Sequence, residues 1–218
     1  MTGRGPGIGN LPYMARRSPL PPPPPPVGIR TWPDRDALLR DRAVVLGELV
    51  RTHIGPEPLG VLLVWAGLGA VGWGLVGSAL LAFEEGSDPF GVTLGVALAV
   101  VGICCLVPSA VFIALGVARD RRVRRLMDAW GGLEPDPEGD LRLRAPRAST
   151  VWLVLSFLLC AVGLFVCVSV PATARPGEDT YGKVALWMGL GLIAWLTGLI
   201  GLVKAFTHRR WVLRTVRR

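Results

Sequence analysis

The sequence predicts an all-α integral membrane protein, a bundle of four transmembrane helices with both termini in the cytoplasm. Three observations lead to this fold class. The chain of 218 residues is 51% hydrophobic and only 18% charged, with a mean hydropathy of +0.47, whereas a soluble domain is usually about 25% charged. Four long segments contain no charged residue and no histidine. The lysine and arginine residues are distributed unevenly between the connections that join these segments.

The four apolar segments are residues 59–83, 90–118, 149–171 and 184–203. The hydrocarbon core of a bilayer is about 30 Å thick, and a helix needs roughly 20 residues to cross it. Because lipid offers no hydrogen-bond partners, apolar segments of this length must satisfy their own backbone groups, which favours helices. We therefore expect residues 59–203 to form a transmembrane domain with these four spans.

The basic residues predict the orientation of the spans. Eight lysine and arginine residues precede the first span, eight lie in the loop 119–148 and six in the tail 204–218, whereas the other two loops hold only Arg175 and Lys183. Basic residues flanking spans stay on the cytoplasmic side during insertion. The preference for arginine over lysine, with abundant Ala, Gly, Pro and Val, indicates a GC-rich bacterial genome. We expect a multi-pass protein of the bacterial plasma membrane.

Residues 1–30 are expected to be a disordered, proline-rich N-terminal tail. The run Pro21–Pro26 favours an extended polyproline II conformation that builds no packed core. It has two interpretations: a ligand for an aromatic-lined groove, or a stiff spacer. Translation starts at either Met1 or Met14, since both are compatible with the sequence.

Residues 31–55 predict a cytoplasmic amphipathic helix before the first span. Thr31 is the candidate N-cap, and Gly55 followed by Pro56 ends the pattern. Leucine and valine side chains recur at helical spacing, as at Leu46 and Leu49, so one face is apolar. This face must pack against something. The candidates are the membrane surface, the central loop (residues 119–148) and another protein.

The basic loop 119–148 begins with a second amphipathic pattern, which we expect Gly131 and Gly132 to end. Val123, Leu126, Met127 and Trp130 share one helical face, and arginines cover most of the remainder. Helices of this kind lie in the lipid headgroup region, and the basic tail 204–218 repeats the chemistry. The candidates for contact with anionic lipid are Arg119, Arg121, Arg122, Arg124, Arg125, Arg209 and Arg210. The positive-inside rule and anchoring at the membrane surface are enough to explain why arginines cluster here. The alternative is a specific binding site for a lipid or a nucleic acid.

Small residues recur at every fourth position in the spans, which allows helix backbones to approach closely. They predict either packing inside the bundle or a face for dimerisation. The candidates for helix packing are Gly74, Ser78, Gly91, Gly95 and Gly198.

The residues that commonly carry chemistry form no recognisable motif. The four cysteines, Cys104, Cys105, Cys160 and Cys167, all lie within predicted spans and lack a C-x-x-C spacing, so packing is favoured over a metal site. The only candidates for a catalytic group at the cytoplasmic interface are His53, His208 and Asp128. We predict no catalytic, cofactor-binding or metal-binding residues, and we do not expect an enzyme.

The predicted spans contain no ionisable group of the kind that pumps and proton-coupled carriers use. We therefore expect a non-enzymatic membrane scaffold or interaction protein that acts through its cytoplasmic face. The alternative is a small transporter or channel for a neutral or lipid-like substrate. The expected partners are anionic membrane lipids and an unidentified protein or a second copy of the chain. The net charge of +8 is explained by topology, so nucleic acid is not an expected partner.

Overall fold

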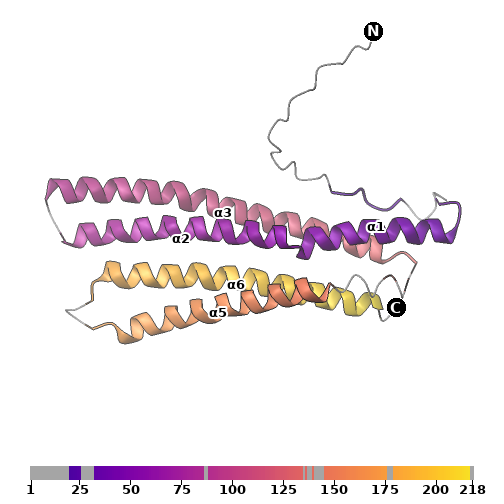
Figure 1. Ribbon diagram of the computed structural model, residues 1–218. Coiled ribbons are helices and arrows are strands. Elements are labelled where there is room, and N and C mark those ends of the chain that lie inside the picture. Colours follow the sequence, from indigo (N-terminus) through magenta and orange to yellow (C-terminus); the bar gives the residue numbers. More distant parts are fainter. Residues whose placement is uncertain are drawn as a thin grey trace, which may run out of the picture.

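The computed structural model describes residues 20–25, 32–85, 88–134, 136, 139, 145–175 and 179–216. Its main elements are five α-helices: α1 (Arg35–Ile54), α2 (Pro56–Glu85), α3 (Pro89–Gly131), α5 (Pro146–Thr173) and α6 (Tyr181–Val216) (Figure 1). The predicted all-helical fold is confirmed. The predicted N-terminal tail lies outside the described residues, except for residues 20–25.

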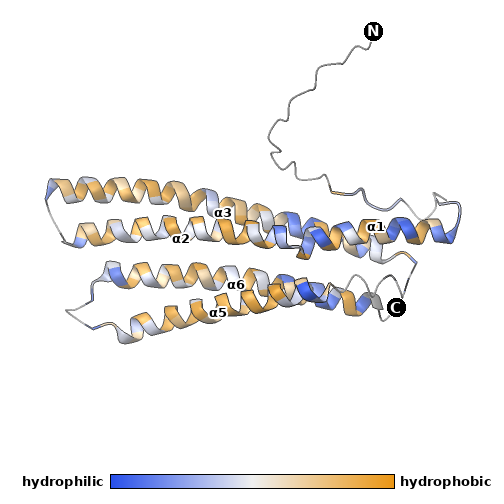
Figure 2. Ribbon diagram, viewed as in Figure 1, coloured by the Kyte–Doolittle hydropathy of each residue, from blue (hydrophilic) through white to orange (hydrophobic). Residues whose placement is uncertain are grey.

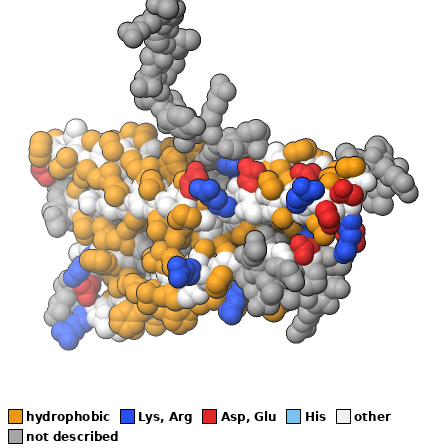
Figure 3. Space-filling view, turned by 45° about the vertical axis from the view of Figure 1, so that its right-hand side comes forward, with side chains coloured by type: hydrophobic (Ala, Val, Ile, Leu, Met, Phe, Trp, Pro, Cys, Tyr) orange, Lys and Arg blue, Asp and Glu red, His pale blue; other side chains and the backbone are white. Residues whose placement is uncertain are grey.

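Four helices are long and apolar enough to cross a membrane: α2, α3, α5 and α6. Within the described residues, the structure thus has as many helices able to cross a membrane as the sequence predicts. Figure 2 shows apolar residues along most of each of these helices, with polar residues gathered toward the end where α1 lies. Large apolar side chains such as Val100, Phe165 and Val168 point outward. Figure 3 shows that such side chains cover much of one face of the molecule. An apolar surface this extensive is suited to lipid rather than water.

The four long helices form two antiparallel hairpins that pack side by side. α2 packs against α3 and α5 against α6, and contacts between α2 and α6 join the hairpins (Figure 1). Glycines permit the close approach within each hairpin. A Cβ atom added to Gly102 would lie 2.6 Å from the carbonyl oxygen of Gly72, and one added to Gly163 would lie 2.6 Å from that of Gly191. Dispersion between closely packed backbones therefore holds these pairs together.

Helix α3 continues well beyond its apolar segment and packs against α1. Leu46, Leu49 and Val50 of α1 are buried in one cluster with Val123, Met127 and Trp130 of α3. The apolar face of α1 thus packs against residues 119–131, the first part of the central loop 119–148. The expectation that the apolar face of residues 119–131 lies against lipid headgroups was wrong, because these side chains are buried against α1. We call α1 together with residues 119–131 the α1–α3 unit.

The ends of α1 are set by local hydrogen bonds. Asp34, not Thr31, is the N-cap: its carboxylate accepts a hydrogen bond from the backbone N–H of Ala37 at 2.7 Å. A carboxylate at this position satisfies a free amide and complements the helix dipole. At the other end, Gly55 separates α1 from Pro56, the first residue of α2. At the C-terminal end of α3, the backbone N–H of Gly132 donates a hydrogen bond to the carbonyl oxygen of Asp128. The helix thus ends at Gly131 and Gly132, as the sequence predicts.

Candidate functional site

A cluster of charged and titratable side chains lies where α1, α3 and α6 meet. Nδ1 of His53, on α1, donates a hydrogen bond to Oδ1 of Asp120, on α3, over 2.7 Å. Nζ of Lys204, on α6, lies 3.0 Å from the same oxygen. The side chains are largely buried, with 1% of His53, 13% of Asp120 and 12% of Lys204 exposed. We call these three residues the Asp120 cluster.

The electrostatics of the cluster favour a negatively charged Asp120. Burial by itself raises the pKa of this carboxyl, but the hydrogen bond and charge of His53, together with those of Lys204, outweigh burial and leave the pKa below its ordinary value. Burial also lowers the pKa of Lys204, and the nearby Arg124 and Arg119 lower it further, while Asp120 opposes the shift. The carboxylate is therefore what makes a buried ammonium group tolerable at this position.

Trp152 connects helix α5 to the cluster. Its side chain is almost fully buried, and its indole Nε1 donates to the carbonyl oxygens of Ile54, at 2.9 Å, and Gly55, at 3.3 Å. Nζ of Lys204 lies 4.9 Å from the centre of the Trp152 ring, a distance at which the cation is attracted to the aromatic face. The junction between α1 and α2 is thereby attached to α5 and α6 at the edge of the apolar segments.

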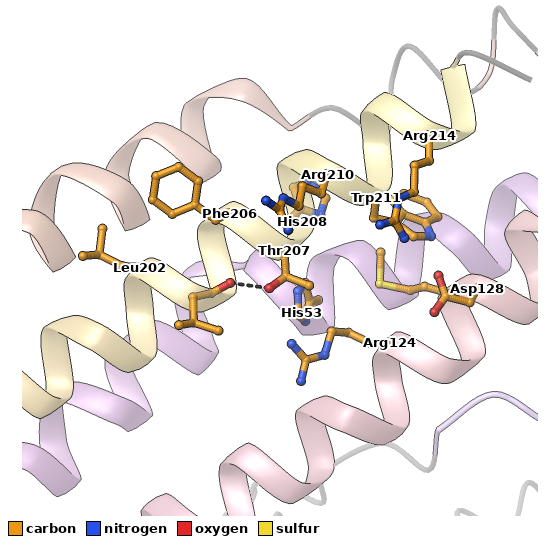
Figure 4. Close-up of a pocket in the computed structure, with 12 residues that line it drawn as sticks. His53, Arg124, Asp128, Leu202, Phe206, Thr207, His208, Arg210, Trp211 and Arg214 are labelled. Carbon is orange, nitrogen blue, oxygen red and sulfur yellow. Dashed lines mark hydrogen bonds between the residues drawn. The ribbon is translucent and has the colours of Figure 1, made fainter.

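A pocket of about 440 Å³ opens beside the cluster (Figure 4). It lies mainly between α3 and α6, and α1 contributes His53. We call it the α3–α6 pocket. Its lining residues are His53, Arg124, Met127, Asp128, Leu202, Val203, Phe206, Thr207, His208, Arg210, Trp211 and Arg214.

The pocket combines positive charge with an apolar side. Arg124, Arg210 and Arg214 contribute three guanidinium groups, against the single carboxylate of Asp128. Within the described part of the chain, no carboxylate lies within ion-pair distance of these three arginines. Val203 and Phe206 are 58% and 53% exposed, so the outer surface of α6 beside the pocket is apolar. The arrangement fits a ligand with an anionic group and a hydrocarbon part.

The structure brings together all three residues that the sequence offered as catalytic candidates. His53, His208 and Asp128 line the α3–α6 pocket, and the two imidazole rings have centroids 6.0 Å apart (Figure 4). Both histidine side chains are only 1% exposed. They therefore act as part of the wall of the pocket, with His53 held in place by Asp120.

A second contact of interest involves the proline run. Nε1 of Trp130, in the α1–α3 unit, donates a hydrogen bond to the carbonyl oxygen of Pro22 at 3.1 Å. Leu20 packs against the same apolar cluster, and Trp32 lies edge-on to Trp130 with ring centroids 6.4 Å apart. Tryptophan side chains and proline carbonyls pair in this way when aromatic grooves bind polyproline II segments. Residues 20–25 are thus docked on the chain's own aromatic residues.

The predicted lipid-contact arginines are distributed over different surfaces. Arg124 and Arg210 line the α3–α6 pocket. Arg121, Arg122, Arg125 and Arg209 are exposed, as is Arg210, whereas Arg119 and Arg124 are half-buried. Sequence reasoning did not single out Arg214, nor Asp120 and Lys204. The sequence did contain a signal for Asp120 and Lys204. Like His53, both lie within a few residues of an apolar segment, so all three are expected at a similar depth relative to the membrane.

The predicted helix-packing residues also differ in their surroundings. A Cβ atom on Gly198 would lie 2.6 Å from both the Cys160 nitrogen and the Ser156 oxygen of α5. One on Gly95 would meet the Phe83 ring at 2.6 Å, and one on Gly91 would meet its own cap residue, Asp88, at 2.8 Å. By contrast, Gly74 has nothing within 4 Å of that position, and Ser78 is exposed with its hydroxyl bonded within its own helix to the Gly74 oxygen.

The four cysteines are free thiols and are divided between the two hairpins. The side chain of Cys105 lies against Gly72 of α2, whereas the thiol of Cys160 contacts the carbonyl oxygen of Trp195 on α6, at 3.5 Å. Cys167 makes a similar contact with the oxygen of Met188, also at 3.5 Å. Cys105, Cys160 and Cys167 therefore fill space between paired helices, whereas Cys104 is exposed.

No family model, curated protein or solved structure matches this chain.

Proposed function

We propose that this protein is a bacterial plasma-membrane scaffold or interaction protein, without enzymatic activity, that acts through its cytoplasmic face. The observation that carries the proposal is the α1–α3 unit. It has a buried core of its own, formed by Leu46, Leu49, Val123 and Met127 among others, beyond the apolar segments of the bundle.

The unit offers a rigid surface to a partner. Because the apolar faces of α1 and α3 are buried against each other, both helices are fixed before any partner arrives. Binding to a preorganised surface avoids much of the entropy that ordering a free helix would cost. The outer side of α1 includes Val44, which is 69% exposed, among polar residues such as Asp41 and Glu48. The α1–α3 unit also already holds one polypeptide segment, through the hydrogen bond from Trp130 to Pro22.

The cytoplasmic placement follows from charge. The end of the bundle that carries α1 also carries the C-terminal part of α6 (Figure 1). In the sequence, 22 of the 24 lysine and arginine residues precede the first apolar segment or belong to the loop 119–148 and the tail 204–218. The positive-inside rule therefore supports a cytoplasmic position for both termini. Arginines at the cytoplasmic leaflet also attract anionic lipids, each by about 1 kcal/mol.

Site-specific photo-crosslinking in native membranes tests the function. A photoreactive amino acid replaces Val44, on the exposed side of α1. The matched control replaces Tyr181, which is 92% exposed and begins α6 at the opposite end of the bundle. We expect one recurrent protein adduct from position 44 and not from position 181, identified by mass spectrometry. An adduct of twice the chain mass would identify a second copy as the partner.

Two results would count against the proposal. Position 44 would yield no recurrent protein adduct under any growth condition, or positions 44 and 181 would capture the same proteins. Reporter fusions after Gly132 test the orientation separately, since we expect them to be active only as cytoplasmic reporters.

A further inference from the structure

We propose that the α3–α6 pocket binds the phosphate-bearing headgroup of an anionic phospholipid, with one acyl chain lying along the exposed side of α6. The inference rests on the proposed function, which places this end of the bundle at the cytoplasmic leaflet. It goes further by replacing diffuse attraction to the membrane surface with a defined site and a defined ligand class.

The charge of the pocket selects an anion. Its three arginines outnumber its one carboxylate, and within the described residues no carboxylate pairs with Arg124, Arg210 or Arg214. Arginine presents a planar fork of donors that matches phosphate oxygens, so several guanidinium groups around one cavity favour a phosphate. The residues come from two helices, and Figure 4 shows Arg124 on α3 opposite the arginines of α6.

The position of the pocket along the helices matches the headgroup layer. Arg210 lies seven residues beyond the apolar segment that ends at residue 203, which at 1.5 Å per residue is about 10 Å. The Cα–Cβ bonds of a helix tilt toward its N-terminus, and both α3 and α6 run toward this end of the bundle. Arg124 and Arg210 therefore lean back toward the bilayer, where lipid phosphates lie.

The apolar side of the pocket distinguishes a lipid from a soluble phosphate. Val203 and Phe206 are exposed and continue the apolar surface of α6. A headgroup among the arginines would place its acyl chain along these side chains without leaving the bilayer. On the side of the pocket away from these residues, Trp211 packs against α3. A Cβ atom added to Gly131 would lie 3.2 Å from the Trp211 ring. Trp211 therefore limits the depth of the site.

The volume is also suitable. A cavity of about 440 Å³ lies within the range of roughly 300–1,000 Å³ that is usual for small-ligand sites. The wall contributed by His53 is fixed by its hydrogen bond to Asp120. The site is therefore largely formed before a ligand enters.

Native mass spectrometry of the full-length protein in a neutral detergent tests the proposal, with phosphatidylglycerol as the probe and phosphatidylcholine as the zwitterionic comparison. The test variant is R124Q/R210Q/R214Q. The matched control is R121Q/R122Q/R125Q, which removes the same charge from exposed positions on α3. We expect the pocket variant to bind phosphatidylglycerol at least about tenfold more weakly and the control to change affinity by about twofold or less. Circular dichroism and gel filtration verify that both variants remain folded.

Two further arms separate the sources of the phosphate. Soluble glycerol 3-phosphate should bind far more weakly than phosphatidylglycerol. The variant V203S/F206S should weaken binding of the lipid but not of glycerol 3-phosphate. Equal losses of phosphatidylglycerol affinity in the two arginine variants would show diffuse attraction to the protein surface. Glycerol 3-phosphate binding as tightly as phosphatidylglycerol would show that the pocket takes a soluble anion. Either result overturns the proposal.

The outcome is separable from that of the proposed function. If the pocket arginines prove irrelevant to lipid binding while the adduct from position 44 persists, only this inference fails. If phosphatidylglycerol binds in the pocket and no partner is captured, only the proposed function fails.

Discussion

His53 and Asp120 lie 67 residues apart in the sequence, yet their side chains are joined by a hydrogen bond of 2.7 Å in the interior of the protein. Lys204, a further 84 residues along, reaches the same carboxylate oxygen. One acidic side chain therefore joins three helices at the edge of the apolar segments. This arrangement has direct consequences for stability.

Replacing Asp120 with asparagine should destabilise the protein strongly. The substitution leaves the charge of Lys204 in a largely buried position without its counterion, and breaking such a pair typically costs about 3 kcal/mol or more. Unfolding in mixed detergent and dodecyl sulfate measures the change. Asp128→Asn, an exposed substitution on the same helix, should change stability by about 0.5 kcal/mol or less. The double variant D120N/K204Q should be less destabilised than the sum of the single variants, because the pair is coupled.

The stability should depend on pH in a manner set by Asp120 and Lys204. The pKa of Asp120 is lowered from 3.8 in the folded state, so its stabilising contribution is complete above that value and is lost as the pH falls through the lower folded pKa. The pKa of Lys204 is lowered from 10.5, so the free energy of unfolding should rise as the pH increases through the folded pKa toward 10.5. Melting curves of the wild type, D120N and K204M over this range provide the measurement. An acid branch that D120N leaves unchanged would contradict the assignment.

The aromatic residues of the α1–α3 unit should bind a proline-rich peptide in trans once the chain's own segment is removed. A variant lacking residues 1–25 should bind a labelled peptide of residues 18–26, whereas the full-length protein should bind it far less, because its own segment competes at high effective concentration. Fluorescence anisotropy measures the affinity. Trp130→Phe in the truncated chain keeps an aromatic ring but removes the indole N–H that bonds to Pro22, and should weaken binding about fivefold, as expected for one hydrogen bond. Equal peptide binding with tryptophan or phenylalanine at position 130 would refute the role of this donor.

Alanine substitutions of glycine should distinguish packed from unpacked positions in the spans. A methyl group on Gly198 would overlap backbone atoms of α5, whereas one on Gly74 would meet nothing within 4 Å. Gly198→Ala should therefore reduce stability by about 1–3 kcal/mol through overpacking, and Gly74→Ala should leave it unchanged or slightly raised. The same mixed-detergent unfolding titration compares them. Similar losses at both positions would mean that the α5–α6 contact is not the cause.

The four helices long enough to cross a membrane were predictable from sequence because the transfer of an apolar segment into lipid depends on its own composition. The same holds for the boundary at Gly131 and Gly132, where local backbone preference ends a helix. The sequence pattern predicts Thr31 as the N-cap of α1, three residues before the actual cap at Asp34. Both are good capping residues, and composition alone does not choose between neighbouring candidates.

The Asp120 cluster, the α3–α6 pocket and the docking of residues 20–25 were decided by tertiary structure. Each requires side chains from helices that are distant in sequence, and their meeting depends on how the hairpins pack and on the rotation of each helix about its axis. The spacing of apolar residues predicted the apolar face of α1 but not what covers it. Lipid, another protein and residues 119–131 of the same chain would all bury such a face equally well. Only the packing of α1 on α3 shows which surface buries it.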